Sequence, residues 1–197
     1  AVAGRDAARR IIPQRPVTLE TLAEMLRGWP LREHYVIQQG IDLTLSDGRV
    51  HDFRLLMQKN GEGNWTATGC AGRIGPQRSV TSNLHGGGTA EPTDRLLRRR
   101  FASDARAEEI RREMERLGYN VAEYLETVFG MLGELGLDIA VDPSGRVWLL
   151  EINPKPSREV FRRIGERDTY RAAHLRPLEY ALWVLDQKKR EPEPNEP

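Results

Sequence analysis

The sequence is poor in cysteine and has no long apolar run. Its one cysteine, Cys70, excludes an intrachain disulfide and favours a reducing compartment. No run approaches the roughly 20 apolar residues that a membrane-spanning helix needs. The start of the chain shows no signal-peptide pattern either. These absences predict a cytoplasmic protein with no membrane partner.

The chain also carries little net charge. Thirty Lys and Arg residues nearly balance 29 Asp and Glu residues, which leaves a formal charge of +1. This balance gives no argument for a nucleic-acid partner. With 39% hydrophobic and 30% charged residues in 197, the composition is that of a globular protein with a heavily charged surface. The length favours a single well-packed domain.

The two ends differ in character from the middle. The first residue is Ala1, and 4–10 show no apolar periodicity, so we interpret 1–33 as a remnant of an upstream lobe. Within it, residues 18–26 have helical spacing behind a Thr18 cap. The last residues, 189–197, are rich in Pro and Glu and are predicted to be a disordered tail. The domain itself is expected over 34–188.

The middle of the chain alternates between strand and helix patterns. Apolar alternation and turn residues predict an extended segment over 35–43 and strands over 50–58 and 65–71. Helical patterns follow over 103–118 and 121–135, and a β-hairpin over 137–153. A closing helix over 169–187 has an apolar stripe of Leu175, Leu178, Leu182 and Leu185. The order predicts an α+β domain, an antiparallel sheet packed with helices.

The hairpin carries a set of hard oxygen donors. Glu151 and Asn153 share one strand face because side chains alternate with a period of two. Pro154 ends the strand there. A carboxylate between Leu150 and Ile152 is costly unless something pairs with it. Asp138 on the first strand could join the pair, which would complete a Mg²⁺ site. Taken alone, Asp138 is equally well a solvated strand residue.

Whether Asp138 joins depends on the turn at 142–145. A two-residue loop at Pro143-Ser144 would place Asp138 opposite Leu149, on the face of Glu151. A G1 bulge at Gly145 would slip the register by one and turn Asp138 away. The metal hypothesis requires the first register, and we therefore predict Asp138 opposite Leu149.

A second cluster of residues suits a polyphosphate. Asp52 and Arg54 share a strand face, and Arg73 follows the next strand. Residues 81–88 then combine small polar residues with three glycines, which lets backbone N–H groups approach an anion. Each piece is weak alone, since a Gly run is more often a flexible loop and Asp-x-Arg more often a surface pair.

In this order the motifs resemble the ATP-grasp ligases, including the glutathione synthetase and ribosomal-protein glutamate ligase branches. The resemblance is closer to the YheC/YheD group of endospore coat-associated proteins and covers about residues 34 to 186. It rests on Tyr35-Val36-Ile37-Gln38-Gln39, on 52–59, on Trp65 and on the ending Glu151-Ile152-Asn153-Pro154-Lys155-Pro156. Six motifs in the family order are specific, although each alone is common.

The resemblance implies ATP and Mg²⁺ as cofactors and a role for each matching position. It implies Mg²⁺ ligation by Asp138, Glu151 and Asn153. It implies adenine binding by the backbone of Gln38, Gln39 and Gly40, nucleotide contact by Asp52, and phosphate contact by Ser82 and Asn83. It implies that Arg54 and Arg73 stabilise the transferred phosphoryl group. Without the family, Gln38 and Gln39 are equally well plain strand residues, His85 reads as structural and Cys70 as a small buried hydrophobe.

Two functions follow from the resemblance, and a third interpretation is a truncated fragment with no activity by itself. The first is the nucleotide- and Mg-binding portion of an ATP-dependent ligase that joins a carboxylate to an amine or thiol through an acyl phosphate. The alternative is a spore-coat-associated binding or structural protein without turnover. The family clamps ATP between two lobes, and nothing before Tyr35 resembles the first lobe with its lysines. We therefore expect that lobe as a partner, and weak binding of Mg·ATP by residues 1–197 alone.

Overall fold

The structure, a computed structural model, describes residues 2–5, 11–15, 17–27, 38–77, 82 and 87–190. In these ranges the elements run in chain order as β1 Val2–Arg5, β2 Ile11–Arg15, α1 Leu19–Arg27, β3 His51–Lys59, β4 Trp65–Ile74, β5 Thr89–Pro92, α2 Thr93–Phe101, α3 Asp104–Phe129, β6 Glu134–Val141, β7 Val147–Asn153, α4 Glu159–Arg163 and α5 Arg167–Arg190. No helix in the described ranges is both long and apolar enough to cross a bilayer.

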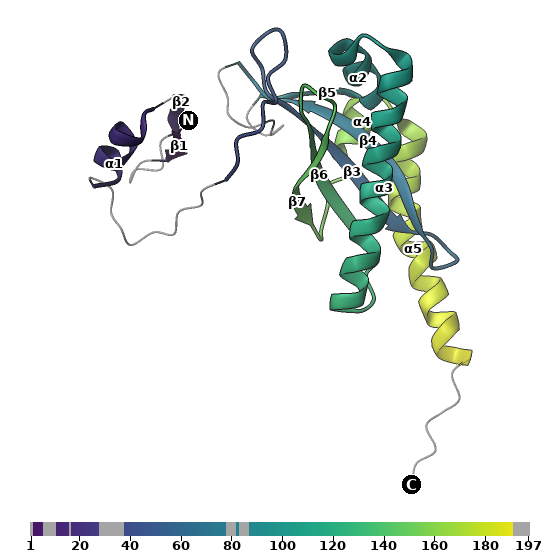
Figure 1. Ribbon diagram of the computed structural model, residues 1–197. Coiled ribbons are helices and arrows are strands. Elements are labelled where there is room, and N and C mark those ends of the chain that lie inside the picture. Colours follow the sequence, from purple (N-terminus) through teal and green to yellow (C-terminus); the bar gives the residue numbers. More distant parts are fainter. Residues whose placement is uncertain are drawn as a thin grey trace.

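Five of the strands form one antiparallel sheet in the order β5-β4-β3-β6-β7 (Figure 1). β1 and β2 form a separate two-stranded sheet. The central strand, β3, pairs with β4 on one side and β6 on the other, so strands far apart in sequence become neighbours. The sheet and its helices confirm the predicted α+β class.

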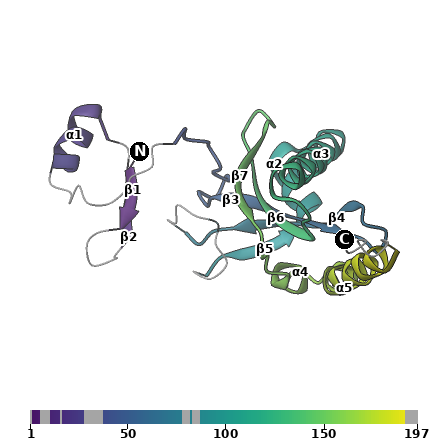
Figure 2. The ribbon, with the colours of Figure 1, turned by 90° about the horizontal axis from the view of Figure 1, so that it is seen from below.

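Helices cover both faces of the large sheet (Figure 2). Phe53, Leu55 and Met57 of β3 point toward α2 and α3 and form the larger core with residues of those helices. Leu56 points to the other face, where it packs with residues of α4 and α5 in a smaller core. Because side chains alternate along a strand, Asp52 and Arg54 lie on the same face as Leu56. The charged candidates of β3 therefore share a face with α4 and α5.

One long helix replaces the two helices predicted over 103–118 and 121–135. α3 runs without interruption across Gly118, and residues 134 and 135 belong to strand β6. Gly118 does not end the helix because it lies against the sheet: a Cβ atom there would sit 2.7 Å from Cδ2 of Leu55 and 2.8 Å from Sδ of Met57. The glycine allows the helix to approach β3 closely.

Substitution of Gly118 tests this packing. We expect Gly118→Val to lower the free energy of unfolding by about 1–3 kcal/mol, because the added atoms have no room between α3 and β3. Urea denaturation measures the change. Asn120→Val is the matched control, since Asn120 is exposed on the same helix. Equal stability of the two variants would contradict a packing role for Gly118.

The predicted closing helix is present as α5, but its apolar stripe does not face the core. Leu175, Leu178, Leu182 and Leu185 are 42–65% exposed, whereas Ala173 and Tyr180 are buried. Polar contacts orient the helix. The carbonyl oxygen of Ala173 accepts hydrogen bonds from Gln58 and Arg158, and Arg176 donates to Thr66 and Thr68. These contacts turn the leucines outward.

The remaining predictions have mixed outcomes. The helix behind Thr18 is α1, and Thr18 Oγ1 accepts a hydrogen bond from the backbone N–H of Thr21. The strands predicted over 50–58 and 65–71 correspond to β3 and β4. Residues 38–43 form no strand, and 35–37 and 191–197 lie outside the described residues. β5 and α2 were not predicted.

Candidate functional site

The turn between β6 and β7 is built by one carboxylate. Oδ1 of Asp142 accepts hydrogen bonds from Ser144 and from the backbone N–H of Arg146, and Oδ2 accepts one from Nε1 of Trp148. These bonds lower the pKa of Asp142 to about 2, the Ser144 side chain contributing most. Gly145 adopts a positive φ of 84° and follows the turn as a G1 bulge. The predicted two-residue loop is therefore wrong.

A second irregularity restores the face of Asp138. The bulge at Gly145 sets Ile139 opposite Leu149, and β7 then contains one extra residue before Asp138 pairs with Glu151. Two slips of one residue return Asp138 to the face that carries Glu151. The predicted position of Asp138 opposite Leu149 is thus wrong. The two carboxylates nevertheless lie directly opposite each other, on one face.

Asn153 continues the same face of β7 and pairs with Gly136 of β6. Its side chain is partly buried, and its Nδ2 atom makes no hydrogen bond within the described residues. Glu151 is exposed and likewise has no ion-pair partner in the described ranges. Two carboxylates and an amide on one face are hard donors whose chemistry fits a hydrated divalent cation.

Four charged side chains form a chain of ion pairs across the sheet. Arg73 donates to both oxygens of Asp52, over 2.7 and 2.5 Å, and its Nη2 also lies 2.9 Å from Oδ2 of Asp138. Arg54 donates from Nε to Oδ1 of Asp138 over 2.5 Å and from Nη2 to Oδ2 over 3.1 Å. Two acids and two arginines thus alternate and neutralise one another. The strands align them, since Asp52 pairs with Arg73 and Arg54 with Asp138.

Burial strengthens the electrostatic interactions within this chain of ion pairs. Asp52, Arg73 and Asp138 are each at most 7% exposed. Burial alone would lower the pKa of Arg73, but its hydrogen bonds to Asp52 and the charges of Asp52 and Asp138 raise that pKa above the ordinary value. The guanidinium of Arg73 therefore stays charged throughout the accessible pH range.

A cavity of about 810 Å³ opens over these residues. Seven of the predicted site residues line it: Gln38, Gln39, Asp52, Arg73, Ser82, Asp138 and Glu151. Ser82 is buried there, whereas Gln38 and Gln39 are exposed at its edge. Gly40 lines a smaller neighbouring cavity with Gln39. Arg54 and Asn153 are not among the lining residues of the large cavity, and Asn83 lies outside the described residues.

The cation would not be held by acids alone. Among the described residues, no three His, Cys, Asp or Glu side chains gather closely enough to bind a metal ion. The predicted set contains two carboxylates and the amide of Asn153, and Asp138 is also engaged by two arginines. Any cation here would keep several water ligands and share its charge balance with the arginines.

The cavity also has lining residues that the sequence did not indicate. Asp42 lies on the segment before β3, where Oδ1 accepts a hydrogen bond from the backbone N–H of Thr44. Its Asp-x-Thr spacing is a local turn signal, but nothing local places it at the cavity. His51 precedes Asp52, is fully buried, and donates from Nδ1 to the carbonyl oxygen of Leu43. Its position on β3 was predictable, and its partner was not.

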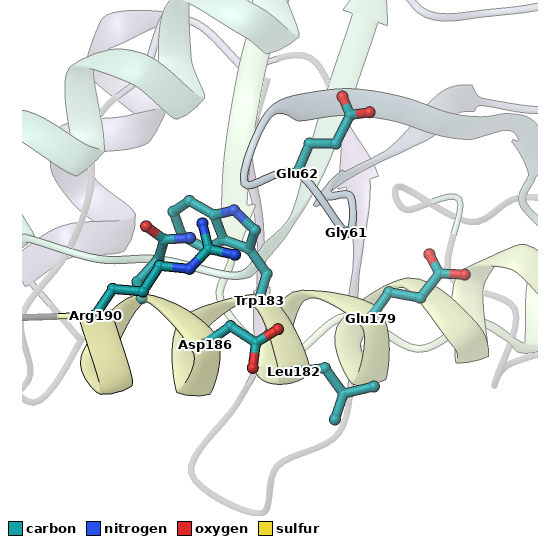
Figure 3. A pocket seen from close by; sticks show the side chains of 8 residues that line it. Gly61, Glu62, Glu179, Leu182, Trp183, Asp186 and Arg190 are labelled. Atoms are coloured by element: carbon teal, nitrogen blue, oxygen red, sulfur yellow. The ribbon is translucent and has the colours of Figure 1, made fainter.

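A separate pocket lies away from this site, between α5 and the turn after β3 (Figure 3). It has a volume of about 480 Å³ and is lined by Gly61, Glu62, Glu179, Leu182, Trp183, Asp186, Gln187 and Arg190. None of the predicted site residues lines it. Burial raises the pKa of the Cys70 thiol to about 12, which leaves it unreactive as a nucleophile.

Comparison with known proteins identifies relatives that match most of this chain. The family model for YheC/D-like ATP-grasp domains matches residues 5–184. The chain is 30% identical over 160 residues to the endospore coat-associated protein YheD of Bacillus subtilis, covering 81% of this chain and 34% of YheD. It is 29% identical over 168 residues to the endospore coat-associated protein YheC of the same organism, covering 80% of this chain and 44% of YheC.

The chain thus spans about a third of YheD and less than half of YheC. The match over residues 5–184 includes the five-stranded sheet, the ion pairs across β3, β4 and β6, and the hairpin that carries Glu151. The chain belongs to the YheC/D-like ATP-grasp family.

Proposed function

We propose that this chain is the nucleotide- and Mg²⁺-binding portion of an ATP-dependent carboxylate ligase. The observation that carries the proposal is the pairing of Asp138 with Glu151 beside a cavity that Asp52 and Arg73 also line. Opposed carboxylates next to two arginines suit a polyphosphate with its metal ion. Membership of an ATP-grasp family supports the same assignment.

In this proposal the hairpin residues hold the metal. Asp138, Glu151 and Asn153 would supply carboxylate and amide oxygens to Mg²⁺. When bound, the ion would supply charge neutralisation between the nucleotide phosphates. The turn stabilised by Asp142 and the extra residue in β7 together fix the register that places the donors on one face.

The remaining site residues would hold the nucleotide and the transferred group. The backbone of Gln38, Gln39 and Gly40 would meet the adenine, Asp52 would approach the nucleotide, and Ser82 and Asn83 would line the phosphates. Arg54 and Arg73 would stabilise charge on the phosphoryl group, because phosphoryl transfer is catalysed mainly by positioning and electrostatics. The closeness of Arg54, Arg73 and Asp138 supports this grouping.

The proposed reaction has two steps. The γ-phosphoryl group of ATP passes to a carboxylate oxygen of the substrate, which gives ADP and an acyl phosphate. An amine or thiol then attacks the acyl carbon and expels inorganic phosphate. The carboxylate and amine substrates and the upstream lobe would complete the site, in line with the greater length of the relatives.

Glu151→Gln tests the metal site. Within the described residues Glu151 makes no ion pair, and it lies opposite the carboxylate of Asp138, which repels it. We therefore expect Glu151→Gln to fold with unchanged or slightly higher stability. Its Mg²⁺-dependent affinity for ATP should fall by about tenfold or more. NMR titration with ATP, with and without Mg²⁺, follows this affinity even when binding is weak.

Glu134→Gln is the matched control. Glu134 lies on β6 but accepts hydrogen bonds from Gln58 and Arg158. This variant should lose about 1–3 kcal/mol of unfolding free energy and keep its nucleotide affinity. A Glu151→Gln protein that behaves in the same way would show that Glu151 is structural and would remove it from the metal site.

A binding or structural role at the spore coat, without turnover, is the second candidate. YheC and YheD are named as endospore coat-associated proteins. The guanidinium of Arg73, fully engaged by two acids, also suits a static structure. Trapping with hydroxylamine separates the two candidates. An active ligase releases ADP and yields a hydroxamate from its carboxylate substrate, whereas a binding protein retains nucleotide without either product.

A further inference from the structure

Asp138 contacts two arginines that are held in different ways. Arg54 donates to both carboxylate oxygens of Asp138, and Nη2 of Arg73 makes a third contact with Oδ2. The acid predicted to bind a cation is therefore already covered by two positive groups. Glu151, directly opposite, has no such partner in the described residues.

Arg73 is fixed independently of Asp138. It makes two hydrogen bonds to Asp52, and all three side chains of this group are nearly inaccessible, with side-chain exposures of 7–9%. If Asp138 were to turn toward another ligand, Arg73 would still be paired and neutralised. Arg73 therefore has no reason to move.

Arg54 is held in place by a single acidic partner. Within the described residues its guanidinium is bonded to Asp138 alone, and its side chain is 13% exposed. Its Cδ atom lies beside Gly136, the β6 residue paired with Asn153, at 3.5 Å from where a Cβ would stand. The side chain thus contacts both Gly136 and Asp138, the β6 residues that pair with Asn153 and Glu151. Any cation that the three donors share would have to approach the Asp138 carboxylate that Arg54 already engages.

We propose that in the nucleotide-free protein Arg54 occupies the oxygens of Asp138 to which the divalent cation would bind. The cation displaces Arg54 from Asp138 when it binds, whereas Arg73 keeps its position. The proposal rests on the metal site of the proposed function. A divalent ion on the Asp138 carboxylate repels both guanidinium groups, but it displaces Arg54, whose two hydrogen bonds both go to Asp138, whereas Arg73 keeps its two hydrogen bonds to Asp52. Arg54 is therefore a positioning residue in the empty site.

The exchange has a consequence for the arginine. Once released from Asp138, which lines the cavity proposed for phosphates, Arg54 carries a permanent charge with no acidic partner in the described residues. Its fork would then be free to bind phosphoryl oxygens in a bidentate way. The arrival of the cation would thus make Arg54 available, and an empty site would keep it neutralised.

The first test uses the unaltered protein and Mg²⁺ alone, without nucleotide. Arginine Nε–H signals are followed by ¹H–¹⁵N NMR during a Mg²⁺ titration. We expect the Arg54 Nε–H signal to shift and to exchange faster with water, because it loses its acceptor, while the Arg73 signal stays unchanged. Saturating Mg²⁺ shifts at Glu151 with an unmoved Arg54 signal would overturn the proposal and leave the metal site standing.

The second test measures Mn²⁺ binding by electron paramagnetic resonance. Arg54→Ala should bind Mn²⁺ about tenfold more tightly than the unaltered protein, because the ion no longer competes with a charge-assisted hydrogen-bond pair. Arg54→Lys is the matched control, because lysine keeps the charge but cannot bind a carboxylate through two N–H groups of one plane. Its Mn²⁺ affinity should lie between those of the unaltered protein and Arg54→Ala. An affinity for Arg54→Lys equal to that of the unaltered protein would show that only net charge matters and would overturn the proposal.

The outcomes separate this proposal from the proposed function. Adding Glu151→Gln to Arg54→Ala should abolish the gain, since the ion then loses one of its own ligands. Absence of Mn²⁺ binding in Arg54→Ala would overturn both the metal site and the exchange. Equal Mn²⁺ affinity of the unaltered protein and Arg54→Ala would overturn the exchange alone. Should Arg54→Ala fail to fold, the NMR titration of the unaltered protein decides.

Discussion

Arg73→Ala is expected to lower the free energy of unfolding by about 3–5 kcal/mol. Removal of this side chain leaves Asp52 buried without its two hydrogen bonds and takes one of the arginines away from Asp138. A buried carboxylate without a partner is costly, whereas the intact pair is nearly neutral in energy. Chemical denaturation at neutral pH measures the loss, together with the far-ultraviolet circular dichroism of the folded state.

A second substitution shows whether uncompensated charge is the cause. Asp52→Ala in the Arg73→Ala background removes the stranded acid and leaves Asp138 paired with Arg54. We expect this double variant to be more stable than Arg73→Ala alone, so the two changes should not add. A double variant that loses the sum of the two single effects would show that packing, and not charge, stabilises this part of the sheet.

His51 should make the stability of the protein depend on pH between about 6.5 and about 4. Burial is the main cause that lowers the pKa of this imidazole to about 4; the hydrogen bond to Leu43 opposes the shift, and the charge of Arg100 adds to it. In the unfolded chain the pKa is about 6.5. The folded state therefore holds His51 neutral, with the proton on Nδ1 that is donated to the carbonyl oxygen of Leu43.

The sign follows from which state binds the proton. Between the two pKa values the unfolded chain takes up a proton at His51 and the folded protein does not, so acid favours unfolding. The contribution is absent above about pH 6.5 and is complete below about pH 4. It amounts to a loss of about 3 kcal/mol over this window. Denaturation curves at a series of pH values give the slope.

His51→Asn provides the control because the amide can still donate to Leu43 but does not titrate. Its stability should start lower, since the ring also packs edge-on against Phe53, and should vary less with pH. The carboxylates titrate alike in both proteins, so the difference between the two curves isolates His51. Parallel curves would show that His51 has the same pKa in the folded and unfolded states.

Local pattern was enough for much of this protein. Alternation placed Asp52 and Arg54 on one face of a strand, and the structure has that strand as β3. The α+β class followed from the order of strand and helix patterns, and the structure places Gln38, Asp52, Arg73, Ser82, Asp138 and Glu151 around one cavity. Periodicity succeeds here because it depends on neighbours two to four residues apart.

Other features were decided only by contacts between distant segments. Gly118 was read as a helix end, yet it lies in mid-helix because β3 comes close to it. The leucines of α5 form the predicted apolar stripe, yet they are exposed, and hydrogen bonds from Gln58 and Arg158 to Ala173 orient the helix. A single helix cannot show which of its faces will find a partner, because that depends on surfaces contributed from elsewhere.

The hairpin combines both kinds of information. The sequence by itself determined that Glu151 and Asn153 share a face, since two residues on one strand always do. It could not decide whether Asp138 faces them, because each bulge reverses the outcome and the structure contains two. The sequence likewise placed Arg54 and Arg73 on strands, but only the tertiary structure brought both onto Asp138. Register and charge pairing are set by the packing of three strands at once, and no local stretch of residues contains that information.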